Sequence, residues 1–335
     1  MSKLIIPNDY RSVLSLYETQ IAICAIKNIF TDHLTRSLNL VRVSAPLFVE
    51  TQTGLNDDLN GVERPVEFEI KETSSSAQIV HSLAKWKRMA LHKYDVPIGS
   101  GLYTDMNAVR RDEEMDNIHS VYVDQWDWEK IIDKTSRNEN YLRKAVNAIV
   151  NAICDTADKI KELYPVLDIN LSRDVKFITT QQLEDIYPKL SPKERENAYT
   201  KECKTVFIMQ IGDCLRSGVK HDGRAPDYDD WKLNGDIIIW NDNLQQAIEI
   251  SSMGIRVDGE ALDLQLTKAN CNHRRELLYH KMLLDGKLPL TIGGGIGQSR
   301  LCMLLLKKAH IGEVQVSVWD EETISGCKSA GIKLL

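Results

Sequence analysis

A long β-hairpin in the second half of the chain most constrains the fold. Residues 235–252 read GDIIIWNDNLQQAIEISS, and two runs of β-forming residues flank the turn formers at 241–243. A hairpin pairs its strands antiparallel. A further apolar run, VFIMQIG at 206–212, precedes it without an intervening helical pattern. We therefore expect an α+β fold, in which helices flank a central and mainly antiparallel β-sheet, rather than a doubly wound parallel sheet.

Several segments have the pattern of helices. Apolar residues recur at helical spacing over 17–35, and 134–163 also reads as a helix. The sequence SPKE at 191–194 has the features of a helix start: an N-cap serine, a proline in the first turn, and a glutamate whose side chain can accept from the N-cap backbone. We expect two more helices, at 273–285 and at 298–312.

Composition excludes several classes of protein. The 335 residues are 43% hydrophobic, but the apolar runs are too short to cross a bilayer, so no membrane partner is expected. The N-terminus lacks a secretory pattern, which predicts a cytoplasmic protein. Seven widely spaced cysteines argue against a disulfide framework and a zinc site. The net charge of −6, without a long basic run, argues against a nucleic-acid partner.

The hairpin brings two acids together. If its turn is centred between Asp242 and Asn243, Asp236 lies directly opposite Glu249. Like charges in such a pair are unfavourable unless a cation lies between them, and Mg²⁺ binds carboxylates together with substrate phosphates. The alternative is a shifted register, or one solvated carboxylate.

A second β segment, HSVYVDQWDW, carries polar residues on one face. Alternation places Val121, Val123, Gln125 and Asp127 together, so that this face would run from the core into a cleft. The alternative is that the two polar residues reach a solvated strand end.

Three further segments could hold an anionic ligand. The segment AVRRDEEMDN presents Arg110 or Arg111, VHSLAKWKR offers Ser82 and Lys87 at a helix start, and GVKHDGRAPDYDDW carries Arg224 in a loop. The alternatives are a solvated charged loop, a solvated helix face and a salt-bridged loop.

The stretch TIGGGIGQSR at 291–300 brings backbone close to another group. It is not a dinucleotide fingerprint, because Arg300 fills the third glycine slot, and it lacks the lysine of a P-loop. Taken alone, it would be a glycine-rich turn.

Together these segments resemble the three ordered motifs of class II aminoacyl-tRNA synthetases, near 17–48, 108–129 and 291–308. Within that superfamily, VHSLAKWKR, HSVYVDQWDWE, RAPDYDDW, SSMGIR and TIGGGIGQSR are similar to signature stretches of the ammonia-dependent (A-type) asparagine synthetase family. The resemblance covers nearly the whole chain. It implies a single catalytic domain over 1–335, of the class II synthetase type, and a homodimer built on the first motif.

The resemblance also implies roles for individual residues. Arg110 is similar to the arginine that grips the α-phosphate of ATP, although Arg111 stays an alternative. The groups implied for ATP are Arg110, the backbone of Gly293, Gly294 and Gly295, and Arg300. Asp236 and Glu249 would hold Mg²⁺. The groups implied for the amino-acid substrate are Asp57, Ser82, Lys87, Gln125, Asp127, Arg224 and Ser251.

The implied reaction is the ATP-dependent conversion of L-aspartate and ammonia into L-asparagine through a β-aspartyl-adenylate, with release of AMP and pyrophosphate. Asp57, Arg110 and Gln125 would be catalytic, with Asp57 either a proton acceptor or a substrate anchor. A glutamine-dependent synthetase would need a glutaminase domain, and a tRNA ligase would need an anticodon-binding domain. A regulatory paralogue would be expected to lose the arginines or the acidic pair, which are present.

Overall fold

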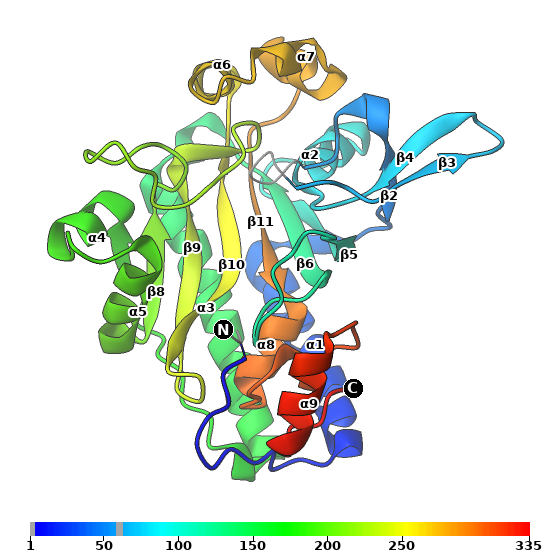
Figure 1. Cartoon of the computed structure of the whole chain (residues 1–335). Helices are drawn as coiled ribbons and strands as arrows, with labels where there is room; N and C mark the ends of the chain where they lie inside the picture. The colour runs from blue at the N-terminus through cyan, green and yellow to red at the C-terminus, as the bar shows by residue number, and fades with distance from the viewer. Residues whose placement is uncertain (1–3, 58–62) are drawn as a thin grey trace.

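A large β-sheet forms the centre of the molecule. The computed structural model describes residues 4–57 and 63–335, whose strands form an eight-stranded and a three-stranded sheet (Figure 1). In spatial order the large sheet contains β1 (Leu40–Arg42), β5 (Gly101–Val109), β6 (Tyr122–Ile131), β11 (Thr291–Gly297), β10 (Gln246–Arg256), β9 (Asp229–Asn241), β8 (Thr205–Met209) and β7 (Lys176–Thr179). Only the outermost pairs, β1–β5 and β7–β8, are parallel within this sheet. The predicted α+β fold with a mainly antiparallel sheet is confirmed.

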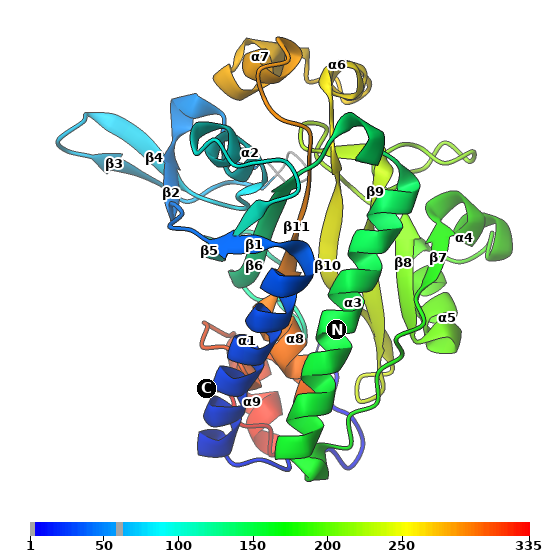
Figure 2. The ribbon, with the colours of Figure 1, turned by 180° about the vertical axis from the view of Figure 1, so that it is seen from behind.

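Two long helices cover one face of this sheet. Helices α1 (Leu16–Leu38) and α3 (Glu139–Leu163) lie side by side in front of the sheet in Figure 2, which confirms the helix predicted at 17–35 and most of the one predicted at 134–163. Their apolar stripes pack on inward side chains of the strands, and the rings of Phe30 and Trp126 are 4.6 Å apart. This apolar layer leaves the opposite face of the sheet available for polar groups.

Shorter helices surround the rest of the sheet. They are α2 (Ala84–Lys93), α4 (Thr180–Ile186), α5 (Pro192–Cys203), α6 (Gly259–Lys268), α7 (Leu278–Leu284), α8 (Gln298–Leu305) and α9 (Glu321–Ser329). The capping box predicted at Ser191 is present. None of the helices within 4–57 and 63–335 has the length and apolar content needed to cross a membrane.

Three predicted helices are shorter than expected. The helix predicted at 134–163 begins at Glu139, because a 3₁₀ turn, η2 (Lys134–Ser136), and the Asn138 cap precede it. A 3₁₀ turn, η4 (Asn272–Glu276), replaces the first part of the helix predicted at 273–285. Helix α8 ends at Leu305, and Lys307 then adopts φ 52°, a left-handed conformation that an α-helix cannot continue through.

The small sheet projects from one side of the body. It contains β2 (Phe48–Glu50), β4 (Ser75–Ile79) and β3 (Glu67–Ile70), in that spatial order (Figure 1). Strand β4 leads directly into α2, so that this unit delivers the segment around Ser82 to the edge of the large sheet.

The layer formed by α1 and α3 should account for a large part of the stability. We expect Ile149→Ala in α3 to lower the free energy of unfolding by about 2–5 kcal/mol, because Ile149 is fully buried and the change leaves a cavity. Asn147→Ala, on the exposed side of the same helix, should change it by less than about 0.5 kcal/mol. Urea unfolding followed by circular dichroism measures both, and equal losses would contradict the described packing.

Candidate functional site

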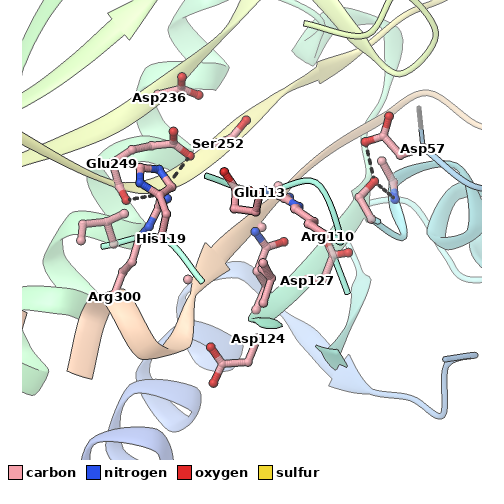
Figure 3. Close-up of a pocket in the computed structure, with 18 of the residues that line it drawn as sticks. Asp57, Arg110, Glu113, His119, Asp124, Asp127, Asp236, Glu249, Ser252 and Arg300 are labelled. Carbon is pink, nitrogen blue, oxygen red and sulfur yellow. Dashed lines mark hydrogen bonds and ion pairs between the residues drawn. The ribbon is translucent and has the colours of Figure 1, made fainter. Parts of the chain in front are cut away.

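A cavity of about 490 Å³ lies on the face of the large sheet that is turned away from α1 and α3 (Figure 3). Most of the residues predicted for the site line it. These are Asp57, Ser82, Arg110, Gln125, Asp127, Arg224, Asp236, Glu249, Gly294, Gly295 and Arg300. Three predicted residues, Lys87, Gly293 and Ser251, do not.

Strand β6 builds the floor of the cavity through simple alternation. Gln125 and Asp127 face the cavity, whereas Trp126 and Trp128 pack in the core beneath α1 and α3. Asp127 is 3% exposed, so the alternative of a solvated strand end is wrong.

Lys87 supports this floor from outside the cavity. Its side chain is fully buried, and its ammonium group donates to the Asp127 carboxylate, to the Trp128 carbonyl at 3.0 Å and to the Gly294 carbonyl at 3.4 Å. Burial lowers the pKa of Lys87, and the neighbouring carboxylates oppose this effect. The helix face that carries Lys85, Lys87 and Arg88 is buried, so the alternative of a solvated helix face is wrong.

A buried ion network continues from this lysine across the sheet. Lys87 Nζ lies 3.8 Å from Glu129 Oε2, and Arg256 Nη2 donates to the same oxygen at 2.8 Å. Arg256 Nη1 also donates to Asp229. Burial acts to raise the pKa of Glu129, but Arg256 and Lys87 outweigh it and hold that pKa below its usual value. Glu129 therefore stays ionised in the interior.

The network ends at the Arg224 guanidinium. Arg224 Nη2 donates to Asp236 Oδ1 at 2.5 Å, Nη1 donates to the Ser252 hydroxyl, and Nε lies 3.9 Å from Asp229 Oδ2. Arg224 thus sits in the cavity wall with its charge balanced by two carboxylates.

The glycine-rich stretch is a central strand rather than a turn. In β11, a Cβ added at Gly293 would lie 2.0 Å from Glu129 Oε2, and one at Gly295 would lie 2.4 Å from Gln125 Oε1. The groups that first exclude a side chain here are the protein's own. Gly293 is therefore covered by the ion network, whereas Gly294 and Gly295 border the cavity.

The register predicted for the hairpin is wrong. Asp236 pairs with Ser252, and Glu249 pairs with Ile238, because the pairing is shifted and a bulge lies between Glu249 and Ser251. A bulge inserts one extra residue into a strand and re-aims the side chains that follow. The two acids nevertheless line the same cavity (Figure 3).

The same bulge explains the position of Ser251. This residue pairs with Ile237, whose side chain lies in the core, and the Ser251 hydroxyl is buried without a hydrogen-bond partner among the described residues. Its neighbour Ser252 lines the cavity instead. The prediction therefore named the serine one residue too early for this cavity.

Asp236 and Glu249 have the chemistry of a cation site. Burial raises the pKa of Asp236 to about 7, the Arg224 guanidinium opposes this, and the Glu249 carboxylate adds to it. No cluster of three or more His, Cys, Asp or Glu ligands occurs in the described part of the chain. A metal held here would take its remaining ligands from a substrate or from water, as Mg²⁺ commonly does.

Two arginines border the same cavity, and one of them, Arg300, lies beside Glu249. Arg300 Nη1 donates to the Glu249 carbonyl at 3.0 Å, and its Nε donates to the Ile118 carbonyl at 3.2 Å. Arg110 lines the cavity with Nη1 3.8 Å from Glu113 Oε2, whereas Arg111 is exposed and does not line it.

Asp57 lies at another part of the cavity wall. The Ser82 hydroxyl donates to Asp57 Oδ2 at 2.9 Å, and Asp57 is 2% exposed. The carbonyl of Asp57 lies 3.0 Å from His81 Nδ1. The adjacent Asp58 lies outside the described residues.

Sequence reasoning missed several residues of this region: Glu129, Asp229, Ser252 and Arg256 of the network, and His119 of the cavity wall. Extending the alternation of β6 by two positions from Asp127 would have found Glu129. Ser252 and Arg256 follow the bulge, and no sequence pattern predicts a bulge at this position.

Comparisons with known proteins place the chain in a family. A family model described as aspartate-ammonia ligase matches residues 17–331. An aspartate–ammonia ligase of Clostridium tetani is 61% identical over 334 residues, which are 99% of this chain and 98% of the relative. One from Bacillus cytotoxicus is 58% identical over 325 residues, which are 97% of this chain and 99% of the relative.

The fold is similar to that of solved class II synthetases. Asparaginyl-tRNA synthetase of Pyrococcus horikoshii, complexed with asparaginyl-adenylate, has a TM-score of 0.62 at 14% identity. The alignment covers 94% of this chain and 74% of the synthetase. The predicted class II synthetase-like fold is thereby confirmed, and the family model and the relatives show that the chain belongs to the aspartate–ammonia ligase family.

Proposed function

We propose that this protein makes L-asparagine from L-aspartate, ammonia and ATP, with release of AMP and pyrophosphate. The observation that carries the proposal is that one cavity contains candidate groups for every substrate. Arg110 and Arg300 could bind the phosphates, and Asp236 and Glu249 could hold the metal ion. Arg224 and Ser82 line the same cavity. The near full-length identity to aspartate–ammonia ligases supports the same reaction. We also propose that residues 1–335 act as one catalytic domain in the cytoplasm.

The chemistry requires activation of the substrate. The β-carboxylate of aspartate is a poor acyl donor, because its leaving group would be oxide. Attack of a β-carboxylate oxygen on the α-phosphorus of ATP forms β-aspartyl-adenylate and expels pyrophosphate. Ammonia then attacks the β-carbonyl carbon, the C–O bond to AMP breaks, and one proton is lost from nitrogen.

The nucleotide would lie against β11 and the loop that precedes β6. Flat backbone at Gly294 and Gly295 borders the cavity and lets a planar group approach. Arg110 would stabilise the charge that grows on the α-phosphate, and Arg300 would bind the outer phosphates. Gly293 would act indirectly, by giving Glu129 room.

Magnesium would be held by Asp236 and Glu249. Both are hard oxygen ligands, and their proximity raises the energetic cost of leaving the pair without a cation. The ion supplies charge neutralisation to the phosphates when it is bound.

Aspartate would bind between the Arg224 loop and the Ser82 segment. Arg224 is the candidate partner for a substrate carboxylate, and Ser252 replaces Ser251 as the nearby hydroxyl. Lys87 would contribute by fixing Asp127 in the floor, because its own ammonium group is enclosed. Gln125 would donate to the β-carbonyl oxygen of the tetrahedral intermediate, and Asp57 would accept the proton of ammonium.

Product analysis tests the function. Purified protein with ATP, Mg²⁺, aspartate and ammonium should yield asparagine, AMP and pyrophosphate in equal amounts, and glutamine should give no gain over ammonium. Formation of ADP and phosphate, or a preference for glutamine, would exclude the proposed reaction.

Substitutions of Arg110 and Arg111 should have different effects. We expect Arg110→Ala to lower turnover by about 10²–10³-fold, since it removes a preorganised donor at the phosphates. Arg111→Ala serves as the matched control, because Arg111 is exposed and outside the cavity. Steady-state pyrophosphate release measures both, and an inactive Arg111→Ala with an active Arg110→Ala would reverse the assignment.

Asp57 can be tested by separating the half-reactions. Asp57→Asn keeps the shape and the hydrogen bond from Ser82, but it removes the basic carboxylate. We expect aspartate-dependent exchange of pyrophosphate into ATP to persist, while asparagine formation is mostly lost. If exchange and synthesis fall together, Asp57 anchors the substrate instead.

We further propose a homodimer that buries the exposed apolar residues of the first-motif region. Tyr17 and Ile21 on α1 and Val41 on the edge strand β1 are exposed. Light scattering should give twice the chain mass of 38.1 kDa at micromolar concentration. A fully active species of single-chain mass would rule the dimer out as a requirement.

A further inference from the structure

A second buried ion cluster lies outside the cavity lining. Its centre is Asp227, which is fully buried and whose Oδ2 is approached by three groups. Arg274 Nη1 donates to it at 2.9 Å, His280 Nε2 lies at 3.0 Å, and Lys85 Nζ donates to it at 3.4 Å. None of these four residues lines the described cavity, so the cluster is not itself a contact of the proposed substrates.

Among the residues that the structure describes, three basic side chains surround the Asp227 carboxylate. Burial alone would raise the pKa of Asp227, but Lys85, His280 and Arg274 hold it well below its usual range. The carboxylate is therefore ionised. Removing Lys85 would leave Asp227 still paired with Arg274 and close to His280.

The cluster joins two segments that both line the cavity. Lys85 lies in the first turn of α2, three residues after Ser82, which lines the cavity. Asp227 lies between Arg224 and Tyr228, which also line it, on the connection from β8 to β9. The ion pair between Lys85 and Asp227 therefore links the Ser82 wall to the Arg224 wall from behind.

The other contacts of this loop lead to a different part of the molecule. The Gln265 side chain in α6 donates to the Pro226 carbonyl at 3.0 Å and to the Asp229 carbonyl at 2.9 Å. Arg274 in η4 and His280 in α7 belong to the same C-terminal helical segment as Gln265. These contacts hold the loop against α6 and α7 when Lys85 is removed, whereas the ion pair between Lys85 and Asp227 joins the loop directly to α2.

We propose that Lys85 is a positioning residue for aspartate, which sets the spacing between the Ser82 wall and the Arg224 wall through Asp227. This inference rests on the proposed function, because it assumes that aspartate binds between those walls. The proposed ATP contacts, Arg110 and Arg300, lie on other segments, so the spacing should matter for aspartate and much less for ATP.

Lys85→Met tests this role. Methionine keeps most of the length of the side chain and removes the charge, and Asp227 retains two of its three partners. We expect the KM for aspartate to rise by about 10–100-fold, since small displacements of binding groups have effects of this size. The KM for ATP should stay within about twofold, and Lys85→Arg, which keeps a cation within reach of Asp227, should recover most of the aspartate affinity.

Lys308→Met is the matched control. Lys308 is also 3% exposed and donates to Ser12 at 2.6 Å and Thr19 at 3.0 Å, and, like Lys85, it does not line the cavity. Thermal unfolding of each variant reports the structural cost of losing a buried lysine. We expect Lys308→Met to lower stability without a selective change in the KM for aspartate.

The outcomes separate this inference from the proposed function. If the unmodified protein makes no asparagine, the function fails and the variants are not needed to decide it. If it is active and Lys85→Met leaves the KM for aspartate unchanged, or changes both KM values as Lys308→Met does, the positioning role is wrong. If Lys85→Met does not fold, Lys85→Gln, which keeps a hydrogen-bond donor, is measured against the same expectation.

Discussion

The buried ion pair between Glu129 and Arg256 is the interaction on which the cavity depends. Arg256 reaches both oxygens of Glu129 at 2.8–3.1 Å, and it joins β6 to β10 across the glycine strand that lies between them. Gly293 has no side chain because these two groups occupy the space above it. Lys87 and Asp229 extend the pair to Asp127 on one side and Arg224 on the other. One network thus orients charged groups at two ends of the proposed aspartate site.

Such a network is a poor source of stability, because the cost of removing charges from water offsets much of their attraction. The network instead fixes the positions of the charged groups at its ends. A fully paired carboxylate or guanidinium in a dry environment has few alternative positions, so the groups at the ends of the network face the cavity in a fixed arrangement. The apolar layer of α1 and α3 on the opposite face supplies the stability that this arrangement requires. One face of the sheet therefore supplies stability, and the other face carries the groups of the proposed active site.

Sequence patterns predicted the elements better than their exact pairing. The two long helices and the hairpin follow from periodicity and turn residues, and Gln125 and Asp127 share a face because β6 is regular. The glycine stretch, which taken alone resembled a turn, is a strand. The turn is centred one residue later than predicted, which shifts the register, and the bulge after Glu249 then places Ser252 rather than Ser251 at the cavity. A solvated face stayed open as an alternative for the helix that carries Lys85 and Lys87, because local sequence carries no information about the distant carboxylates, Asp227 and Asp127, that make their burial possible. Residue roles that came from the family resemblance remain proposals.

The central claim is that this face of the sheet brings the β-carboxylate of aspartate to the α-phosphorus of ATP. The most direct test is to run the reaction with aspartate labelled with ¹⁸O in its β-carboxylate and to analyse the products by mass spectrometry. Attack by that carboxylate transfers one labelled oxygen to AMP for each asparagine formed, and leaves pyrophosphate unlabelled. Label in pyrophosphate or free phosphate, or its absence from AMP, would contradict an aspartyl-adenylate and with it this account of the cavity.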